Sequence, residues 1–348
     1  MPVRHSFRIT ALAAATTVAV AVLAGCAAST PTATAPTAPT AAAVSDSFPV
    51  TLNDAFGKTT IPREPTRVAT WGWGSTEAAI AMGVYPVAVA EQVWTVGADK
   101  LLPWVEEAYT AANKPLPVLL KDSEGGATVP YEQIIAAKPD VILAPYSGLT
   151  QEQHTTLSKI APTVAFPTTA WTTSWDDTIK ITAAALGRSK AGADVLGTIS
   201  TYLAGQAKAN PGFAGKTFAG VWDGDGFVYV YTAQDARISV LTHLGLVAAP
   251  SVAALDTSQG SAFFYKLSYE KLDQLTADFI VSYHNNAGEA AAFLTKPALQ
   301  AIPAVKAGKV AQVSDPLTVS SVSPPTALSM TWSDGMPALI ATIAKVLK

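Results

Sequence analysis

The sequence predicts an α/β protein with two Rossmann-like α/β lobes joined by a single long connector helix. The chain has 348 residues, a length that suits about two domains. Segment 130–146 reads as a short helix, a turn and a buried strand, and segment 268–285 repeats that order. Between the two copies, 189–209 is the longest helical pattern without a proline. A helical connector is stiff, so we expect the lobes to close only slightly on a ligand.

The two copies of the repeat agree in residue type as well as in order. In the first copy, Lys138-Pro139-Asp140 ends the helix, because proline disfavours helix in the residue before it. The apolar run 141–143 that follows is typical of a strand covered on both faces. Four positions are identical, and they pair Tyr131 with Tyr269, Glu132 with Glu270, Asp140 with Asp278, and Ile142 with Ile280.

The repeat predicts a cleft between the lobes. Ligands of open α/β sheets bind outside the carboxyl ends of the strands, on the edge where the preceding helix begins. Each lobe is therefore expected to present a glutamate, Glu132 or Glu270, beside an aromatic loop on that edge. Two such edges that face each other form a cleft with one carboxylate on each rim. Alternatively, each glutamate only stabilises the positive end of its own helix, by about 0.3–1 kcal/mol.

The first lobe is predicted to begin near Phe48. A strand at 67–70 runs into the loop Trp71-Gly72-Trp73, and a helix at 76–82 and a strand at 87–90 follow. Large aromatic side chains in a glycine-rich loop at a strand end are expected to line a cleft. The glycines form neither a dinucleotide-binding fingerprint nor a phosphate-binding loop, which argues against a nucleotide site.

The remaining elements follow in chain order. A helix at 153–160, a strand at 162–166 and a helix within 171–186, capped by Ser174, complete the first lobe. In the second lobe, strands at 217–222 and 227–231 flank a turn that contains Asp223 and Asp225. These aspartates suggest calcium, but no ordered set of oxygen ligands follows them, so a simple turn is favoured. A strand at 310–313 and a helix at 326–347 end the chain.

The N-terminus predicts a lipid-anchored protein. A basic start and the apolar run 9–24 have the pattern of a signal peptide. Leu23-Ala24-Gly25-Cys26 resembles a bacterial lipobox, which implies cleavage before Cys26 and acylation of that residue. The predicted parts are a signal peptide (1–25), a disordered tether (26–47), a first lobe (48–188), a connector (189–212) and a second lobe (213–348). We expect the protein on the outer face of the cytoplasmic membrane.

Composition and motifs exclude several functions. The net charge is -3 and no basic stripe is present, so nucleic-acid binding has no electrostatic support. The sequence contains no G-x-S-x-G and no H-E-x-x-H motif. Beyond the signal peptide the only histidines are His154, His243 and His284, which are far apart. This pattern argues against a hydrolase and against a protein for zinc or manganese uptake.

Residues 48–348 resemble the periplasmic-binding protein family that serves iron-siderophore and cobalamin importers. The phrases that carry the resemblance are RVATWGWGSTEAAIAMGVYPVAVAE, LLPWVEEAY, PYEQIIAAKPDVILAPYSGLTQEQHTTLSKIAPTV, SWDDTIKITAAALGRS and SYEKLDQLTADFIV. The third phrase is the most specific, and it is similar to ferric-siderophore lipoproteins of the high-GC Gram-positive type. The resemblance implies the class III fold of periplasmic-binding proteins, with two lobes and a rigid helical connector.

The resemblance also implies a function. It indicates a substrate-binding lipoprotein of an ABC importer, not an enzyme, that captures a ferric siderophore, of the hydroxamate type, and delivers it to a membrane permease. In the family one glutamate per lobe docks onto arginines of the permease dimer, which works with an ATPase, and the motif matches give this role to Glu132 and Glu270. We expect a monomer that needs no cofactor and holds no metal of its own.

The candidate ligand-binding residues are aromatic or polar and follow strand ends. They are Trp71, Trp73, Trp94, Tyr146, Trp171, Trp222, Arg237, Tyr283 and His284. Arg237 either donates charge-assisted hydrogen bonds to ligand oxygens or forms an ion pair at a helix start. Tyr283 and His284 either complete the coordination of iron or only donate and accept hydrogen bonds.

Three other readings stay open at this point. Haem or cobalamin would also suit a cleft with aromatic walls in this fold. A secreted lipoprotein enzyme belongs to a different class, and turnover of a substrate would identify it. A sensor or adhesion lipoprotein would use the fold without transport.

Overall fold

The computed structural model describes residues 46–92, 100–122 and 124–348. By its internal contacts the chain divides into two units, Met1–Ala43 and Val44–Lys348, and every element described below belongs to the second unit. The signal peptide, Cys26, most of the tether and Trp94 lie outside the described residues, so their predicted roles stay predictions.

The first lobe is built on a parallel sheet of five strands in the order β5-β4-β3-β6-β7. The strands are β3 (Val68–Thr70), β4 (Ala88–Ala90), β5 (Val118–Leu120), β6 (Val141–Leu143) and β7 (Thr163–Val164). The helices are α1 (Ser75–Ala81), α2 (Pro103–Ala111), α3 (Tyr131–Ala137), α4 (Gln151–Leu157) and α5 (Trp175–Ala185). The chain leaves β3 in one direction and returns on its other side through β6, which makes β3 the switch point where such sheets bind ligands.

The second lobe is built on a mixed sheet in the order β11-β9-β8-β12-β13, with β10 paired to the start of β8. The strands are β8 (Thr217–Gly224), β9 (Phe227–Tyr231), β10 (Val247–Ala248), β11 (Phe264–Ser268), β12 (Phe279–Tyr283) and β13 (Val310–Val313). Strand β9 is antiparallel to β8 and β11, whereas β12 is parallel to β8 and β13. The α/β prediction of two lobes is therefore confirmed, but the second sheet is not purely parallel.

Short helices fill the connections of the second lobe. They are η1 (Pro211–Phe213), α7 (Ala236–Thr242), α8 (Pro250–Leu255), η2 (Tyr269–Gln274), α9 (Ala287–Thr295), η3 (Pro297–Ala301), α10 (Pro303–Lys306), α11 (Pro316–Val322), η4 (Ser329–Thr331) and α12 (Met336–Val346). The helix predicted over 326–347 begins only at Met336 as an α-helix. In the second copy of the repeat, the helix is a 3-10 helix rather than an α-helix.

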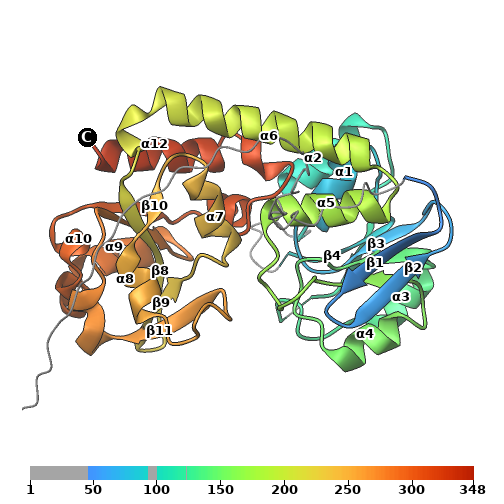
Figure 1. Cartoon of the computed structure of the whole chain (residues 1–348), viewed down its shortest axis with the longest axis horizontal. Helices are drawn as coiled ribbons and strands as arrows, with labels where there is room; N and C mark the ends of the chain where they lie inside the picture. The colour runs from blue at the N-terminus through green and yellow to red at the C-terminus, as the bar shows by residue number, and fades with distance from the viewer. Residues whose placement is uncertain (1–45, 93–99, 123) are drawn as a thin grey trace, which may run out of the picture. The chain divides into compact units, whose positions relative to one another are not determined.

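The connector is α6, which spans Ser189–Ala209 and lies across both lobes (Figure 1). Ile199 and Leu203 of α6 are buried in one apolar cluster together with Leu143 of the first sheet and Phe218 of the second. The lobes therefore share a core beneath α6. A wide opening of the lobes would expose that core to water, which costs about 25 cal/mol of free energy for each Å² of apolar surface.

A second link between the lobes was not predicted. After β13 the chain crosses back, and Leu317, Leu328 and Trp332 pack against an apolar cluster of the first lobe. The rings of Trp332 and Trp104 lie 5.2 Å apart between their centroids. The segment between β13 and α12 therefore braces the two lobes in addition to α6.

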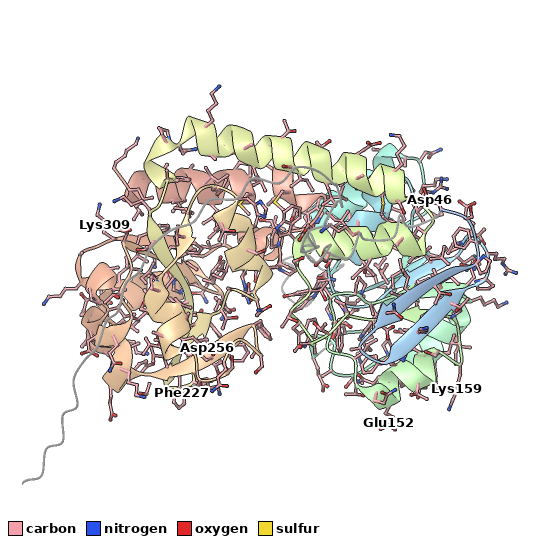
Figure 2. The ribbon with its side chains drawn as sticks, in the orientation of Figure 1. Asp46, Glu152, Lys159, Phe227, Asp256 and Lys309 are labelled. Carbon is pink, nitrogen blue, oxygen red and sulfur yellow. The ribbon has the colours of Figure 1, made fainter. Side chains whose placement is uncertain are left out.

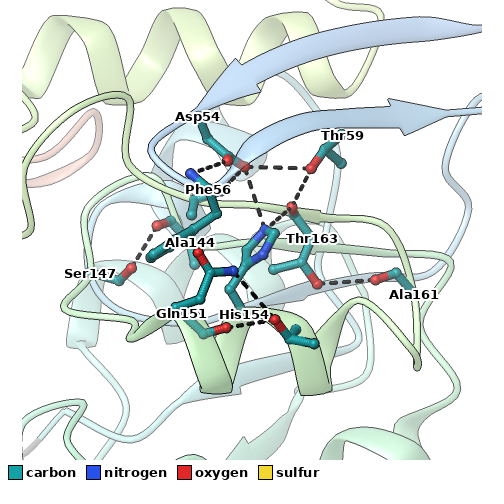
Figure 3. A network of polar contacts seen from close by, with 11 residues as sticks. Asp54, Phe56, Thr59, Ala144, Ser147, Gln151, His154, Ala161 and Thr163 are labelled. Carbon is teal, nitrogen blue, oxygen red and sulfur yellow. Dashed lines mark hydrogen bonds and ion pairs between the residues drawn. The ribbon is translucent and has the colours of Figure 1, made fainter.

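A hairpin of β1 (Val50–Asp54) and β2 (Gly57–Ile61) precedes the first sheet. Asp54 fastens it to the lobe, because its carboxylate lies 3.5 Å from His154 Nε2 (Figure 3). The same carboxylate accepts a hydrogen bond from the Ala165 N–H. The Thr59 hydroxyl donates to the Thr163 carbonyl at 2.8 Å. Within the described ranges, no helix has both the length and the apolar character to cross a membrane.

Candidate ligand-binding cleft

A cleft of about 390 Å³ lies between the two lobes. Its walls come from the loops after β3, β5, β6 and β7 in the first lobe, from β8, β9 and the ends of β11 and β12 in the second, and from α7 and the region of α11. The carboxyl ends of the parallel strands in both sheets thus meet at one site, as the repeat predicted. The volume lies in the usual range for pockets that bind small molecules.

Most of the predicted ligand residues come together in this cleft. The seven that line it are Trp73, Tyr146, Trp171, Trp222, Arg237, Tyr283 and His284. Trp94 lies outside the described residues.

Trp71 is the exception, and its placement corrects the sequence interpretation. Its side chain is only 1% exposed and packs in the core of the first lobe, away from the cleft. The Trp71 N–H donates to the Leu143 carbonyl, so Trp71 continues the strand and points to the buried face. Gly72, with φ of +84°, then turns the chain, and Trp73 emerges at the cleft. A Cβ on Gly72 would lie 2.3 Å from the Tyr146 carbonyl oxygen, which explains the glycine.

Three aromatic side chains form the wall of the first lobe. The ring centroid of Trp73 lies 5.0 Å from that of Trp171 and 6.1 Å from that of Tyr146. Trp171 itself adopts a φ of +62°. Its indole lies so close to Gly148 that a Cβ there would meet Nε1 at 2.3 Å. The glycine therefore makes room for the wall, and the packed rings hold it in place.

Sequence reasoning missed the aromatic face of the second lobe. Tyr229, Tyr231, Phe263 and Phe264 also line the cleft, and the rings of Tyr229 and Trp222 lie 5.0 Å apart. The signal was present in β9, because side chains two apart on a strand share a face. Applied to the predicted strand 227–231, this rule places both tyrosines on one side of the sheet, and the pairing of Tyr229 with Trp222 makes it the side that Trp222 occupies.

Arg237 lies in the cleft wall and is also part of a buried ion pair. Its Nε and Nη2 donate to the carboxylate of Asp235 at 2.8 and 2.6 Å, and its Nη1 donates to Ser323 Oγ at 2.9 Å. The guanidinium carbon lies 3.6 Å from the ring centroid of Tyr231. Burial disfavours its charge, but Asp235 and Tyr231 more than offset burial and raise the pKa of Arg237 well above its ordinary value. Arg237 is therefore a fixed cation whose charge Asp235 balances.

Tyrosine hydroxyls surround this ion pair. Burial, followed by the charge of Asp235, raises the pKa of Tyr146 above its ordinary value, and burial also raises the pKa of Tyr283. Both phenols thus stay protonated and can donate hydrogen bonds. The Tyr283 hydroxyl is buried and has no hydrogen-bond partner among the described residues. Such a group favours a ligand oxygen that accepts its proton, since an unpaired buried polar group costs about 1–3 kcal/mol.

His284 contributes a neutral imidazole. Burial lowers its pKa to about 4, so the ring is uncharged at neutral pH. Its Nε2 lies 2.8 Å from Ser282 Oγ and 3.3 Å from Gln312 Nε2, which engages this nitrogen within the protein. Among the described residues, the charges at the cleft wall therefore reduce to the balanced pair of Arg237 and Asp235, and no group of three or more His, Cys, Asp or Glu is placed to hold a metal ion.

The two repeated glutamates are exposed on the surface. Glu132 lies in the first turn of α3 and Glu270 in the first turn of η2. α3 leads into β6, and η2 leads from β11, which runs parallel to β8, into β12. Both helices therefore begin at the carboxyl edge of their sheet, the edge that carries the cleft. This arrangement agrees with one carboxylate on each rim.

Fold and cleft define a two-lobed α/β binding protein whose ligand site lies between its lobes. Residues 68–317 match the family model described as periplasmic binding protein, and the chain belongs to that family. Among functionally curated proteins, no sequence matches the chain.

Solved structures of the same fold support this assignment. The chain is 32% identical to Streptococcus pneumoniae PiaA in complex with ferrichrome, with a TM-score of 0.78 over 86% of this chain and 98% of that one. It shares the fold of a periplasmic solute binding protein from Mycobacterium smegmatis, with 24% identity, a TM-score of 0.70 and coverages of 86% and 99%. It also shares the fold of Staphylococcus aureus SirA complexed with staphyloferrin B, with 24% identity, a TM-score of 0.64 and coverages of 85% and 96%.

Proposed function

We propose that this protein is the substrate-binding component of an ABC importer and captures a ferric siderophore in the cleft between its lobes. The observation that carries the proposal is an aromatic cleft that holds a charge-balanced Arg237 and the unpaired hydroxyl of Tyr283. A ferric siderophore supplies its own iron ligands, so the protein needs only shape, rings and a few hydrogen-bond donors. The similarity to PiaA in complex with ferrichrome points the same way.

The charge of the cleft favours a hydroxamate complex. Three singly charged hydroxamates neutralise the charge of iron(III), so the complex needs no net charge from the protein. Arg237 and Asp235 cancel each other, and His284 is neutral. A catecholate complex carries several negative charges, and burying them in a neutral cleft is costly.

Tryptophan fluorescence tests the ligand directly. Trp73, Trp171 and Trp222 line the cleft, so ferrichrome is expected to quench the emission at sub-micromolar concentration. Haem and cobalamin serve as comparison ligands. Quenching by either of them, without any response to ferric hydroxamates, would assign the cleft to that ligand instead.

A pair of tyrosine variants tests the role of Tyr283. Tyr283→Phe removes a hydroxyl that lacks a partner among the described residues, so the fold should lose nothing while ferrichrome binds about 2- to 10-fold more weakly. Tyr265 is a matched control, because it is equally buried and its hydroxyl also lacks such a partner, but it lies in the core on the opposite face of the sheet. Tyr265→Phe should leave the dissociation constant unchanged. Equal effects of the two changes would remove Tyr283 from the site.

The proposal includes delivery to a permease dimer that works with an ATPase. Exposed pairs of glutamate and arginine contribute about 0.2–1 kcal/mol each, so Glu132 and Glu270 would orient a docking event without trapping it. The double change Glu132→Ala and Glu270→Ala should lower uptake of iron-55 from ferrichrome about 2- to 30-fold while the quenching of tryptophan stays normal. Undiminished uptake would argue against docking and in favour of a sensor.

We further propose that Cys26 is acylated and holds the protein, as a monomer, on the outer face of the membrane. A membrane anchor raises the effective concentration of the protein near its permease. Cells that express Cys26→Ala should incorporate no labelled palmitate into the protein. Labelled palmitate in that variant would contradict the proposed acylation of Cys26.

A further inference from the structure

A partly buried polar cluster lies behind the cleft wall of the second lobe. The Lys296 ammonium donates to both carboxylate oxygens of Asp223, at 3.1 and 2.8 Å, and to the Tyr269 hydroxyl at 2.6 Å. The Tyr269 hydroxyl in turn donates to Asp223 Oδ1 at 2.7 Å. The same ammonium lies 4.6 Å from the ring centroid of Tyr269. Each of the three groups thus contacts the other two.

This cluster joins two surfaces that the proposed function treats separately. Asp223 follows Trp222 in β8, and successive side chains of a strand point to opposite faces. The Trp222 side chain therefore lines the cleft, while the Asp223 side chain contacts the elements on the far face of the sheet. Tyr269 precedes Glu270 in η2. The contact between Asp223 and Tyr269 therefore connects the cleft, which Trp222 lines, to the exposed surface that carries Glu270.

The first lobe is built differently at the equivalent place. Tyr131, the counterpart of Tyr269, has its hydroxyl beside that of Thr156 in α4. Neither residue lines the cleft. Glu132 is thus carried by a helix that rests on its own lobe, whereas Glu270 is carried by a helix pinned to the back of the ligand wall. Neither of the two short helices has a side-chain cap at its start, so the contact of each tyrosine is what distinguishes them.

We propose that Lys296 is a positioning residue that holds Tyr269 against Asp223 and so ties the placement of Glu270 to the state of the cleft. The inference rests on the proposed function. A ligand that packs on Trp222 fixes the end of β8, and Lys296 passes that restraint to η2. A loaded cleft therefore orders the docking glutamate of the second lobe, while the glutamate of the first lobe is ordered in either state.

Amide hydrogen exchange, followed by mass spectrometry, tests the linkage without the permease. Ferrichrome should slow exchange in Tyr269–Gln274 several-fold in the wild-type protein and leave Tyr131–Ala137 unchanged. In Lys296→Met, ferrichrome should still quench tryptophan emission, but the slowing in Tyr269–Gln274 should vanish. Lys296→Arg, which keeps the cation, should restore part of it. Slowing that persists in Lys296→Met, or that appears equally in Tyr131–Ala137, would overturn the inference.

Hydrogen exchange of the protein without ligand is an independent test of the role of Lys296. Lys271 lies in η2 itself and its side chain is exposed. Lys271→Met is therefore the matched control for loss of a lysine. Without any ligand, Lys296→Met should speed exchange in Tyr269–Gln274 several-fold relative to Lys271→Met, and equal rates would overturn the positioning role. Absence of quenching by ferrichrome would count against the proposed function, and this unloaded comparison would still decide the role of Lys296.

Discussion

The two lobes begin their sheets with the same contact but finish their cleft walls in different ways. In the first lobe, the N–H and hydroxyl of Thr66 donate to Asp140 at 2.9 and 2.8 Å. In the second, the same groups of Thr217 donate to Asp278 at 2.7 and 2.9 Å. The repeated aspartate therefore ties the start of β6 or β12 to the start of the central strand β3 or β8.

The walls differ because the sheets differ. The first sheet is parallel, so its wall consists of loops that leave the strand ends and turn at Gly72 and Gly148. The second sheet contains the antiparallel pair of β8 and β9, so its wall includes strand residues such as Tyr229. A shared scaffold thus holds one wall by close backbone packing and the other by strand pairing.

The largest loss of stability is expected at Gly72, where the loop after β3 packs against the backbone of the loop after β6. Gly72→Ala places a Cβ 2.3 Å from the Tyr146 carbonyl oxygen at a φ of +84°, so it should reduce the free energy of unfolding by about 3 kcal/mol or more. Gly83 has a φ of +80° but open space around it, so Gly83→Ala should cost only about 1 kcal/mol. Urea unfolding measures both. Equal losses would show that the wall is not held by this contact.

A smaller difference in the free energy of unfolding is expected between variants of the two repeated aspartates, Asp140 and Asp278. Asp140 accepts hydrogen bonds from Thr66 and also from the Arg67 N–H at 2.9 Å, whereas Asp278 is exposed and accepts from Thr217. Asp140→Asn is therefore expected to cost about 2 kcal/mol and Asp278→Asn about 1 kcal/mol. Asp194→Asn removes a carboxylate from an exposed ion pair on α6 and is the control for loss of charge. A larger loss for Asp278→Asn would reverse the comparison.

The smallest effect is a pH dependence of opposite sign in the two lobes. The hydrogen bond to Asp54 raises the pKa of His154, against the effect of burial, so its stabilisation is complete below pH about 6.5 and is lost as pH rises through the raised pKa. Burial lowers the pKa of His284 to about 4, so stability is lost as pH falls below about 6.5, by about 1 kcal/mol between pH 7 and pH 5.5.

Melting temperatures between pH 5.5 and pH 8.5 measure both histidines. His154→Gln should flatten the alkaline side of the profile, and His284→Gln should flatten the acid side. A profile that keeps its shape in either variant would mean that the corresponding histidine does not titrate as its surroundings indicate.

The repeat allowed much of the fold to be predicted, because local signals determine it. Pro139 ends α3, and the short apolar run after it forms β6. The exposure of Glu132 and Glu270 at helix starts also follows from this order. These features depend on neighbours in the sequence, which the sequence displays directly.

The rest depends on contacts between distant segments. Trp71 and Trp73 flank one glycine, and only the backbone contact with Tyr146 decides which indole faces the cleft. Trp332 packs on Trp104 across the lobes, although the sequence around it favours a helix. The cluster behind β8 joins Asp223 to Lys296, 73 positions away. Side chains of the second lobe, such as Phe227 at the exposed end of β9 (Figure 2), likewise take their surroundings from paired strands.

The core shared beneath α6 has a mechanical consequence. That core and the brace through Trp332 resist separation of the lobes. The distance between Glu132 and Glu270 is therefore nearly constant. Under the proposed docking role, a permease whose two basic sites lie at a different distance could not bind both glutamates, because the lobes do not move apart to match it. Selection among transporters would then follow from a length built into the scaffold.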